Sequence, residues 1–402
     1  MKKLLSLLFA ALIPIMAYPG GYSIPEQGSK AAGMGGAFTG LANDPSAIYF
    51  NPAGISFQSG MNLMVGSTFV SPTSQYQNPA FSNTIYKQKS LFFVIPQVFF
   101  TYEWEYGLTF GAGIYAPFGL GTEWEKGWVG DYYARKTDLQ NIHFAGVVSY
   151  KLMDNLSVAG SFAYSYASAV LEKKGDKIGL AGDVSLEGSG SGFHVGLSAL
   201  YKPIDNLSVG VNYKLGTELK MSGDIKFSGD RVKSVTDGNE GTGEVTLPIP
   251  ANLNVGLAYN VMSDLTITAD YNWNQWSKYD KLEIINTDKN ITLSSSPRNW
   301  KDTNTYRIGA EYRGVEDFAF RVGYLIDSDP VDTKYSEPSL PDAGRTGYTF
   351  GAGYQIMEGL NIDAYMLLLS WDEKHVTDNE FAFNGYYNTK ATLSGLSLTY
   401  KF

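Results

Sequence analysis

Alternation of apolar and polar residues with a period of two is the feature that most limits what this chain can fold into. From Met61 onward, about fourteen segments of roughly ten or more residues place bulky apolar side chains on one face and small or polar side chains on the other. The last of them alternates Leu396, Leu398 and Tyr400 with small or polar residues. This period predicts β-strands, and a shift of one residue would turn every side chain to the wrong face.

The connections between these segments alternate between short turns and long polar loops. Turn-forming residues make six short connections, one near 103–105 and the others at 153–155, 204–206, 262–264, 315–317 and 357–359. Seven long connections lie at 71–90, 117–138, 172–190, 223–241, 282–298, 327–344 and 376–388. An even number of strands, with tight turns at one rim and long loops at the other, is typical of outer-membrane proteins. We therefore predict an all-β fold, a transmembrane antiparallel β-barrel of about fourteen strands, over residues 60–402.

The N-terminal residues 1–17 have the features of a signal peptide. Two lysines follow Met1, an apolar run begins at Leu4, and the segment ends on Met16 and Ala17. The run is shorter than the ~20 residues of a transmembrane helix, and Pro14 interrupts it. We expect cleavage after Ala17, export to the outer membrane of a Gram-negative bacterium, and insertion of the mature chain through strands.

Composition supports this interpretation and excludes several classes of site. The mean hydropathy of -0.15 is that of a water-soluble protein, but strands with one lipid face and one polar lumen face average to such a value. A secreted β-sandwich or propeller is the soluble alternative, and it gives no reason for the alternation of short and long connections. The absence of cysteine excludes thiol catalysis and cysteine-based metal sites, and the net charge of -9 argues against a nucleic-acid partner.

Residues 18–59, ahead of the first strand, are rich in glycine and do not have the pattern of a strand. They also contain apolar residues that need burial, such as Met34, Phe38 and Ile48. We expect this segment to lie inside the barrel as a plug, which a barrel of this size can enclose. A flexible periplasmic tail is the alternative.

Two motifs in this segment point to a known family. The run Gly33, Met34, Gly35 and Gly36, and the tripeptide Asn51, Pro52 and Ala53, resemble the N-terminal hatch of FadL-type proteins, outer-membrane transporters of long-chain fatty acids and aromatic hydrocarbons. Further matches occur in family order at 115–124, 247–250, 273–277, 299–306 and 340–345. The resemblance covers nearly the whole mature chain, and it implies a fourteen-stranded barrel closed by a hatch that contains these seven residues.

The resemblance also implies a kink in the third strand that opens a gap through the wall, so that ligand leaves sideways into the membrane. An apolar cargo suits such a path because it avoids water. We expect the third strand at 106–116, with its kink marked by Gly111, Gly113, Pro117 and Gly119, since glycine and proline in a strand mark bulges or broken pairing. A merely flexible strand end is the alternative.

Ligand-binding candidates fall into two groups. Apolar residues crowd the loop after the third strand, and they either contact ligand or pack as a lid over the barrel: Phe118, Leu120, Trp124 and Trp128. A fatty acid would also need a buried cation, and alternation turns several basic residues toward the lumen: Lys214, Arg307, Arg321 and Arg345. Such residues are often paired with neighbours such as Glu311. Ser168 follows Tyr166-Ala167 where several fatty-acid transporters carry arginine, which leaves neutral hydrocarbons open.

The function expected from the sequence is passive uptake of hydrophobic small molecules, with a general porin as the alternative. A porin lacks a glycine-rich plug. An outer-membrane enzyme is a remote second class, because His143, His194 and His375 are far apart in the sequence and no Ser-His-Asp spacing accompanies them. We expect no catalytic residue, metal or cofactor. The expected partners are a hydrophobic ligand, outer-membrane lipid and lipopolysaccharide, and the barrel-assembly machinery, which would read Phe402; a monomer is expected.

Overall fold

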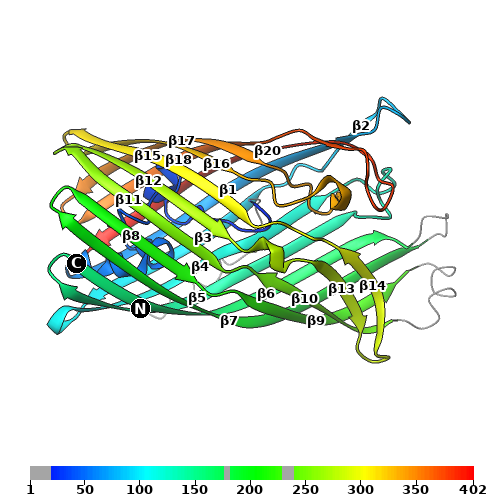
Figure 1. The fold of residues 1–402 in the computed structure, drawn as a ribbon, viewed down its shortest axis with the longest axis horizontal. Coiled ribbons are helices and arrows are strands. Elements are labelled where there is room, and N and C mark those ends of the chain that lie inside the picture. The colour runs from blue at the N-terminus through cyan, green and yellow to red at the C-terminus, as the bar shows by residue number, and fades with distance from the viewer. Residues whose placement is uncertain (1–19, 176–181, 229–239) are drawn as a thin grey trace.

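The computed structural model describes residues 20–175, 182–228 and 240–402 (Figure 1). The expected signal peptide, residues 1–17, lies outside this range. Across the described residues, no helix is both long and apolar enough to cross a membrane.

In the described part of the chain, fourteen antiparallel strands close into a barrel, since the first strand pairs with both the second and the last. Ten strands are continuous: β1 (Met61–Gln77), β3 (Phe93–Glu103), β4 (Leu108–Glu123), β5 (Lys136–Met153), β6 (Leu156–Lys174), β7 (Asp183–Ile204), β16 (Phe318–Asp327), β17 (Arg345–Met357), β18 (Leu360–Trp371) and β20 (Gly385–Lys401). Four consist of two pieces each: β8 (Leu207–Lys214) with β9 (Thr217–Phe227), β10 (Gly241–Ile249) with β11 (Asn252–Met262), β12 (Leu265–Asn274) with β13 (Lys281–Asn286), and β14 (Ile291–Pro297) with β15 (Thr303–Val315). The predicted fold class is confirmed.

Short turns join the strands at one end of the barrel, and the longer connections lie at the other (Figure 1). The long connections carry small elements: β2 (Ile85–Lys87), β19 (Lys374–Val376) and η4 (Thr333–Tyr335). The 3-10 helix η3 (Trp276–Lys278) lies between the two pieces β12 and β13, and η2 (Glu105–Gly107) lies in a short turn. The loop predicted at 282–298 is wrong, because β13 and β14 occupy most of it. Leu282, Ile284 and Leu293 in these strands pack against the buried apolar cluster, so the hairpin extends the wall.

The two faces of each strand differ as the alternation predicts. On β16, Phe320 is 48% exposed and Val322 is 53% exposed, while Arg321 between them is 4% exposed. The exposed apolar face is the one that meets lipid, and the buried face meets the contents of the lumen.

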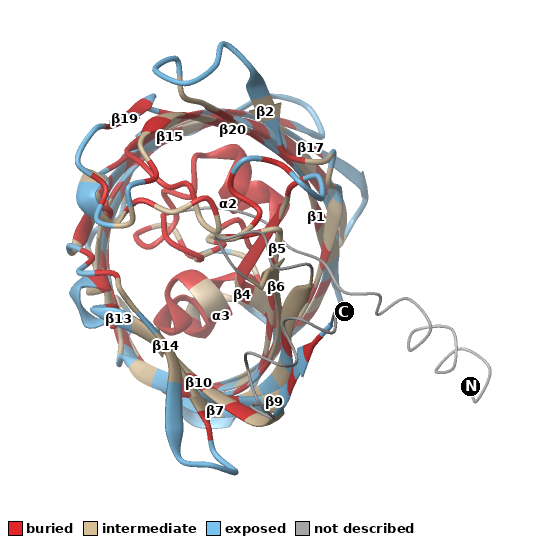
Figure 2. Cartoon of the chain, turned by 90° about the vertical axis from the view of Figure 1, so that its right-hand side faces the viewer, coloured by how far each residue is buried: buried red, intermediate tan, exposed pale blue. Residues whose placement is uncertain are grey.

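Residues 20–59, hereafter the hatch segment, lie inside the ring of strands (Figure 2). They form α2 (Ser29–Gly33), α3 (Ala47–Phe50) and the 3-10 helix η1 (Pro52–Phe57). These helices are too short to be stable alone, so contacts with the wall must hold them in place.

Candidate transport site

The Asn-Pro-Ala tripeptide fixes the hatch segment to three neighbouring wall strands. The Asn51 amide donates to the backbone oxygens of Thr39, at 2.8 Å, and of Ala199 on β7, at 3.1 Å, and its Oδ1 caps η1 by accepting from Ala53 N–H. Proline suits the first position of η1, where its missing N–H costs nothing.

Serines of the wall complete this anchor. The Ala53 N–H donates to Ser198 Oγ at 3.0 Å, and the Ala53 oxygen accepts from Ser157 on β6 at 2.7 Å and from Ser149 on β5 at 3.3 Å. All of these groups are buried, so each depends on its partner here for hydrogen bonding.

The Gly-Met-Gly-Gly run lets the hatch segment approach the opposite wall closely. Gly35 and Gly36 have φ values of 70° and 75°, which residues with a side chain rarely adopt. A Cβ on Gly323 of β16 would lie 2.2 Å from Gly35 N, so the wall also needs glycine at this contact. The Arg307 guanidinium donates to Gly35 O at 2.7 Å, and Met34 is fully buried beneath.

The third strand, β4, leaves its neighbour β3 halfway along its length. Pairing with β3 ends at Val98 and Ile114, although β4 continues to Glu123 and stays paired with β5. A bulge between Tyr115 and Phe118 interrupts the pairing with β5. The outer half of β4 therefore has one edge without a wall strand.

Part of that edge is occupied by the start of the hatch segment. Ser23 pairs with Phe118 in an antiparallel bridge. The Ile24 N–H donates to Pro117 O at 2.6 Å, and the Gly119 N–H donates to Tyr22 O at 2.8 Å. We call residues 22–24 the gate strand.

These contacts correct the expected position of the kink. Pro117 lies inside β4 rather than beyond its end, and it falls in the bulge, where its missing N–H leaves no unpaired donor. Gly119 lies next to the bulge, but Gly111 and Gly113 pair regularly with both β3 and β5. Their lack of a side chain instead makes room for the hatch segment, because a Cβ on Gly111 would lie 3.0 Å from Ile48 and Ile55.

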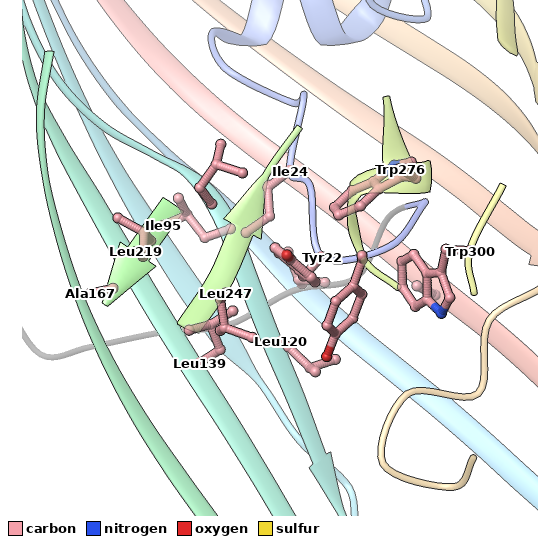
Figure 3. Packing of buried hydrophobic residues seen from close by; sticks show 14 of the residues in the cluster. Tyr22, Ile24, Ile95, Leu120, Leu139, Ala167, Leu219, Leu247, Trp276 and Trp300 are labelled. Carbon is pink, nitrogen blue, oxygen red and sulfur yellow. The ribbon is translucent and has the colours of Figure 1, made fainter. Parts of the chain in front are cut away.

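The segments that carried the family resemblance converge on Tyr22 of the gate strand (Figure 3). The Tyr22 ring packs edge-on against Trp276 at 4.7 Å, and its hydroxyl donates to Pro248 O. Trp300 also packs beside it, and the preceding Gly21 N–H donates to Asp342 Oδ2 at 2.7 Å. Tyr22 is 2% exposed, so these distant segments together hold the gate strand in place.

Two cavities lie on either side of this point. The outer cavity, on the side of the long loops, has about 1550 Å³ of space between protein atoms, part of it open to solvent, and is lined mainly by apolar side chains such as Leu120, Leu139, Leu171 and Leu247. The inner cavity, next to the hatch segment, has about 1100 Å³ of such space, again partly open to solvent, and is lined on one side by Tyr115, Pro117 and Phe118 of the β4 bulge. Tyr22 lines the outer cavity, and Ser23 lines the inner one.

The apolar ligand-binding candidates divide between the cavities and the loops. Phe118 lines the inner cavity and Leu120 the outer one. Trp124 and Trp128 line neither; their rings stack at 4.3 Å, and their N–H groups donate to Pro338 O and Ala134 O. Both indoles are buried among loop side chains, as a lid packing would place them.

The arginine candidates also differ from one another. Arg321 lines neither cavity, and it is bound on both sides at 2.6 Å by Glu311 and Asp363. Arg345 lines the inner cavity but is paired with Asp327. Arg307 lines the same cavity, and its guanidinium donates to the neutral oxygens of Asn272 and Gly35. Arg321 is therefore a structural residue, which corrects its assignment as a ligand contact.

The match to a known family decides what kind of protein carries this site. Residues 10–402 match the family described as outer membrane protein transport protein (OMPP1/FadL/TodX). The chain belongs to the FadL family. It is an outer-membrane protein with a transport function.

Relatives in the FadL family are similar over almost their whole length. The chain is 24% identical to the 47 kDa outer membrane protein of Pasteurella multocida, covering 93% of this chain and 92% of that protein. It is 22% identical to the long-chain fatty acid transport protein of Escherichia coli K12, over 98% and 96% of the two chains.

Solved structures show the same fold. The chain superimposes on a FadL homologue from Pseudomonas aeruginosa with a TM-score of 0.85 and 20% identity, covering 95% of this chain and all of that one. The toluene transporter TodX of Pseudomonas putida gives a TM-score of 0.76 and 19% identity, over 95% and 99% of the chains.

Some residues of this FadL-family site could not be found from sequence spacing. His143 on β5 and His194 on β7 are separated along the chain, yet their rings lie 4.5 Å apart at the inner cavity. The register of β5, β6 and β7 brings both rings to the same height of the barrel wall. Tyr22 was missed although the motifs that surround it were recognised.

Burial raises the pKa of two carboxyl groups beside the gate strand. The pKa of Glu26 is raised by burial, although Arg307 and Arg345 act in the opposite direction. Burial likewise raises the pKa of Asp342, in a loop, to about 6, against the lowering effect of Arg345. Asp342 accepts hydrogen bonds from Gly21 and Trp371. Its charge state therefore affects the strength of the bond to Gly21, which directly precedes the gate strand.

Proposed function

We propose that the protein is a passive channel that takes up hydrophobic small molecules from outside and releases them sideways into the membrane through the wall between β3 and β4. The observation that carries this proposal is the end of β3–β4 pairing at Val98 and Ile114, with the gate strand on the edge of β4 that this leaves. Long-chain fatty acids and aromatic hydrocarbons are the two cargo classes in question.

The outer cavity supplies the first step. Its leucine side chains offer an apolar surface at the end where the long loops lie, and transfer of a hydrophobic molecule from water onto such a surface is favourable. Tyr22 then separates the molecule from the inner cavity, so passage requires the gate strand to leave β4.

The hatch segment favours a sideways exit over a path to the periplasm. Below the inner cavity, passage through the lumen would require breaking the buried hydrogen bonds of Asn51 and Ala53 with β5, β6 and β7. Displacing residues 22–24 would break two backbone hydrogen bonds to β4 and the contacts of Tyr22 with Pro248 and Trp276. This movement leaves the anchor of Asn51 and Ala53 in place, and it opens toward the edge of β4 and the lipid beyond.

Comparison with a porin tests the proposed function. Purified protein in planar bilayers should give little steady ion conductance, because the hatch segment fills the lumen, while cells that produce it should take up a hydrophobic probe faster than cells without it. Stable stepwise conductance combined with no gain in probe uptake would show that a general porin is the better description.

A further inference from the structure

The inner cavity has walls of opposite character. Its apolar side includes Ile48, Phe50, Phe118 and Ile249. Its polar side carries a chain of hydrogen-bonded asparagines on β11 and β12: Asn252, Asn254, Asn272 and Asn274. A molecule that fits both walls has an apolar chain and a polar head.

The charges on this cavity are predominantly positive. Among its described lining residues, Asp327 is the one acid, and it is paired with Arg345. Arg307 has the acids Glu26 and Asp270 close enough to act on it. Lys214 on β8 differs, since none of the carboxylates in the described part of the chain forms an ion pair with it; its Nζ lies 3.8 Å from the centre of the Tyr49 ring.

Two histidines extend this basic region. His143 on β5 and His194 on β7 line the cavity, and they are 5% and 9% exposed. The Nε2 atom of each is buried with no hydrogen-bond partner in the structure, although buried polar groups are normally bonded. An imidazole nitrogen that carries its proton can donate to an anion.

We propose that the inner cavity binds an amphiphile through a carboxylate head held by Lys214 and the Nε2 atoms of His143 and His194, with its apolar chain along the wall that includes Phe118. This inference rests on the proposed function and selects acids over neutral hydrocarbons as cargo. A carboxylate gives the half-buried Lys214 ammonium an anionic partner and accepts from both imidazoles, whereas a hydrocarbon offers none of the three groups a hydrogen-bond acceptor.

A matched pair of ligands tests the head group. Decanoate and decanol share a chain length, and binding of each to the protein in nanodiscs is measured by tryptophan fluorescence, with empty nanodiscs as the blank. The wild type should bind decanoate at least about tenfold more tightly than decanol, as expected for a buried charge-assisted contact. Lys214→Met should remove that preference and leave decanol binding unchanged, and Lys214→Arg should retain it.

The controls distinguish failure of the carboxylate site from failure of the proposed transport function. Lys220→Met changes an exposed lysine on β9 and should keep the preference. Unchanged decanol binding by Lys214→Met shows that the cavity is folded. Equal binding of acid and alcohol by the wild type, or a preference that survives Lys214→Met, overturns the carboxylate site alone. Failure of both ligands to bind would overturn the proposed function itself.

Discussion

Asn51→Ala should loosen the hatch segment without unfolding the barrel. The change removes three hydrogen bonds, two donated by the side-chain amide and one accepted from Ala53 N–H. At about 0.5–1.5 kcal/mol each, their loss amounts to about 1.5–4.5 kcal/mol, which raises the open population of the hatch segment roughly 10-fold to 2000-fold.

Hydrogen exchange and solute leak measure this effect. Amides of the hatch segment, such as Ala53 and Phe38, should exchange faster by that factor, and liposomes carrying the variant should admit a small sugar faster than wild type. Wall amides should keep their protection, because the barrel hydrogen bonds are not altered.

Asn78→Ala is the matched control. Asn78, in the first long loop, also accepts from the N–H two residues on and donates to a distant backbone oxygen, that of Asn384. Its loss should affect neither hatch exchange nor leak. If Asn51→Ala leaves both unchanged in a protein that still shows heat-modifiable migration, the tripeptide does not hold the hatch segment.

Three further changes have expected outcomes. Gly111→Val should lower the yield of folded protein, because the new side chain crowds the hatch segment at a cost of about 1–3 kcal/mol. Gly146→Val should not lower the yield, because a Cβ there has no neighbour within 4 Å. The gel mobility shift of the folded barrel compares the two variants. Because the folded pKa of Asp342 is raised to about 6, its destabilising effect should appear as pH rises from about 4 through 6, and Asp342→Asn should remove that part of the pH dependence of thermal unfolding. Phe402→Glu should reduce assembled protein in outer-membrane fractions, since Phe402 directly follows β20 as a 62% exposed aromatic; unchanged assembly would contradict its role as an assembly signal.

The barrel could be predicted from sequence because its cause is local. A period of two in strands such as β16, and turn residues such as those at 315–317, specify faces and connections without knowledge of the partners. The division of four strands into two pieces could not be predicted in this way. For example, β13 has the apolar residues of a strand, but it lies in a stretch whose polar composition is that of a loop.

The site was predicted less completely because it depends on contacts between distant residues. Proline at 117 marked the bulge in β4 correctly, since a missing N–H acts locally. Gly111 looked the same in sequence, yet its role is contact with α3 and η1. The ion pairs of Arg321 and the meeting of His143 with His194 follow from the register between strands, which no single segment contains.

A disulfide between the gate strand and β4 tests whether uptake requires residues 22–24 to leave β4. Ser23 and Phe118 are bridge partners, and antiparallel partners about 4.5–5.5 Å apart at Cα suit a disulfide, in a chain that has no other cysteine. The pair Ile326→Cys and Thr346→Cys, opposite each other on β16 and β17, is the control. Oxidation of Ser23→Cys/Phe118→Cys should abolish uptake of a hydrophobic probe, reduction should restore it, and the control pair should be unaffected. Normal uptake by the fully oxidised gate variant would contradict exit through this part of the wall.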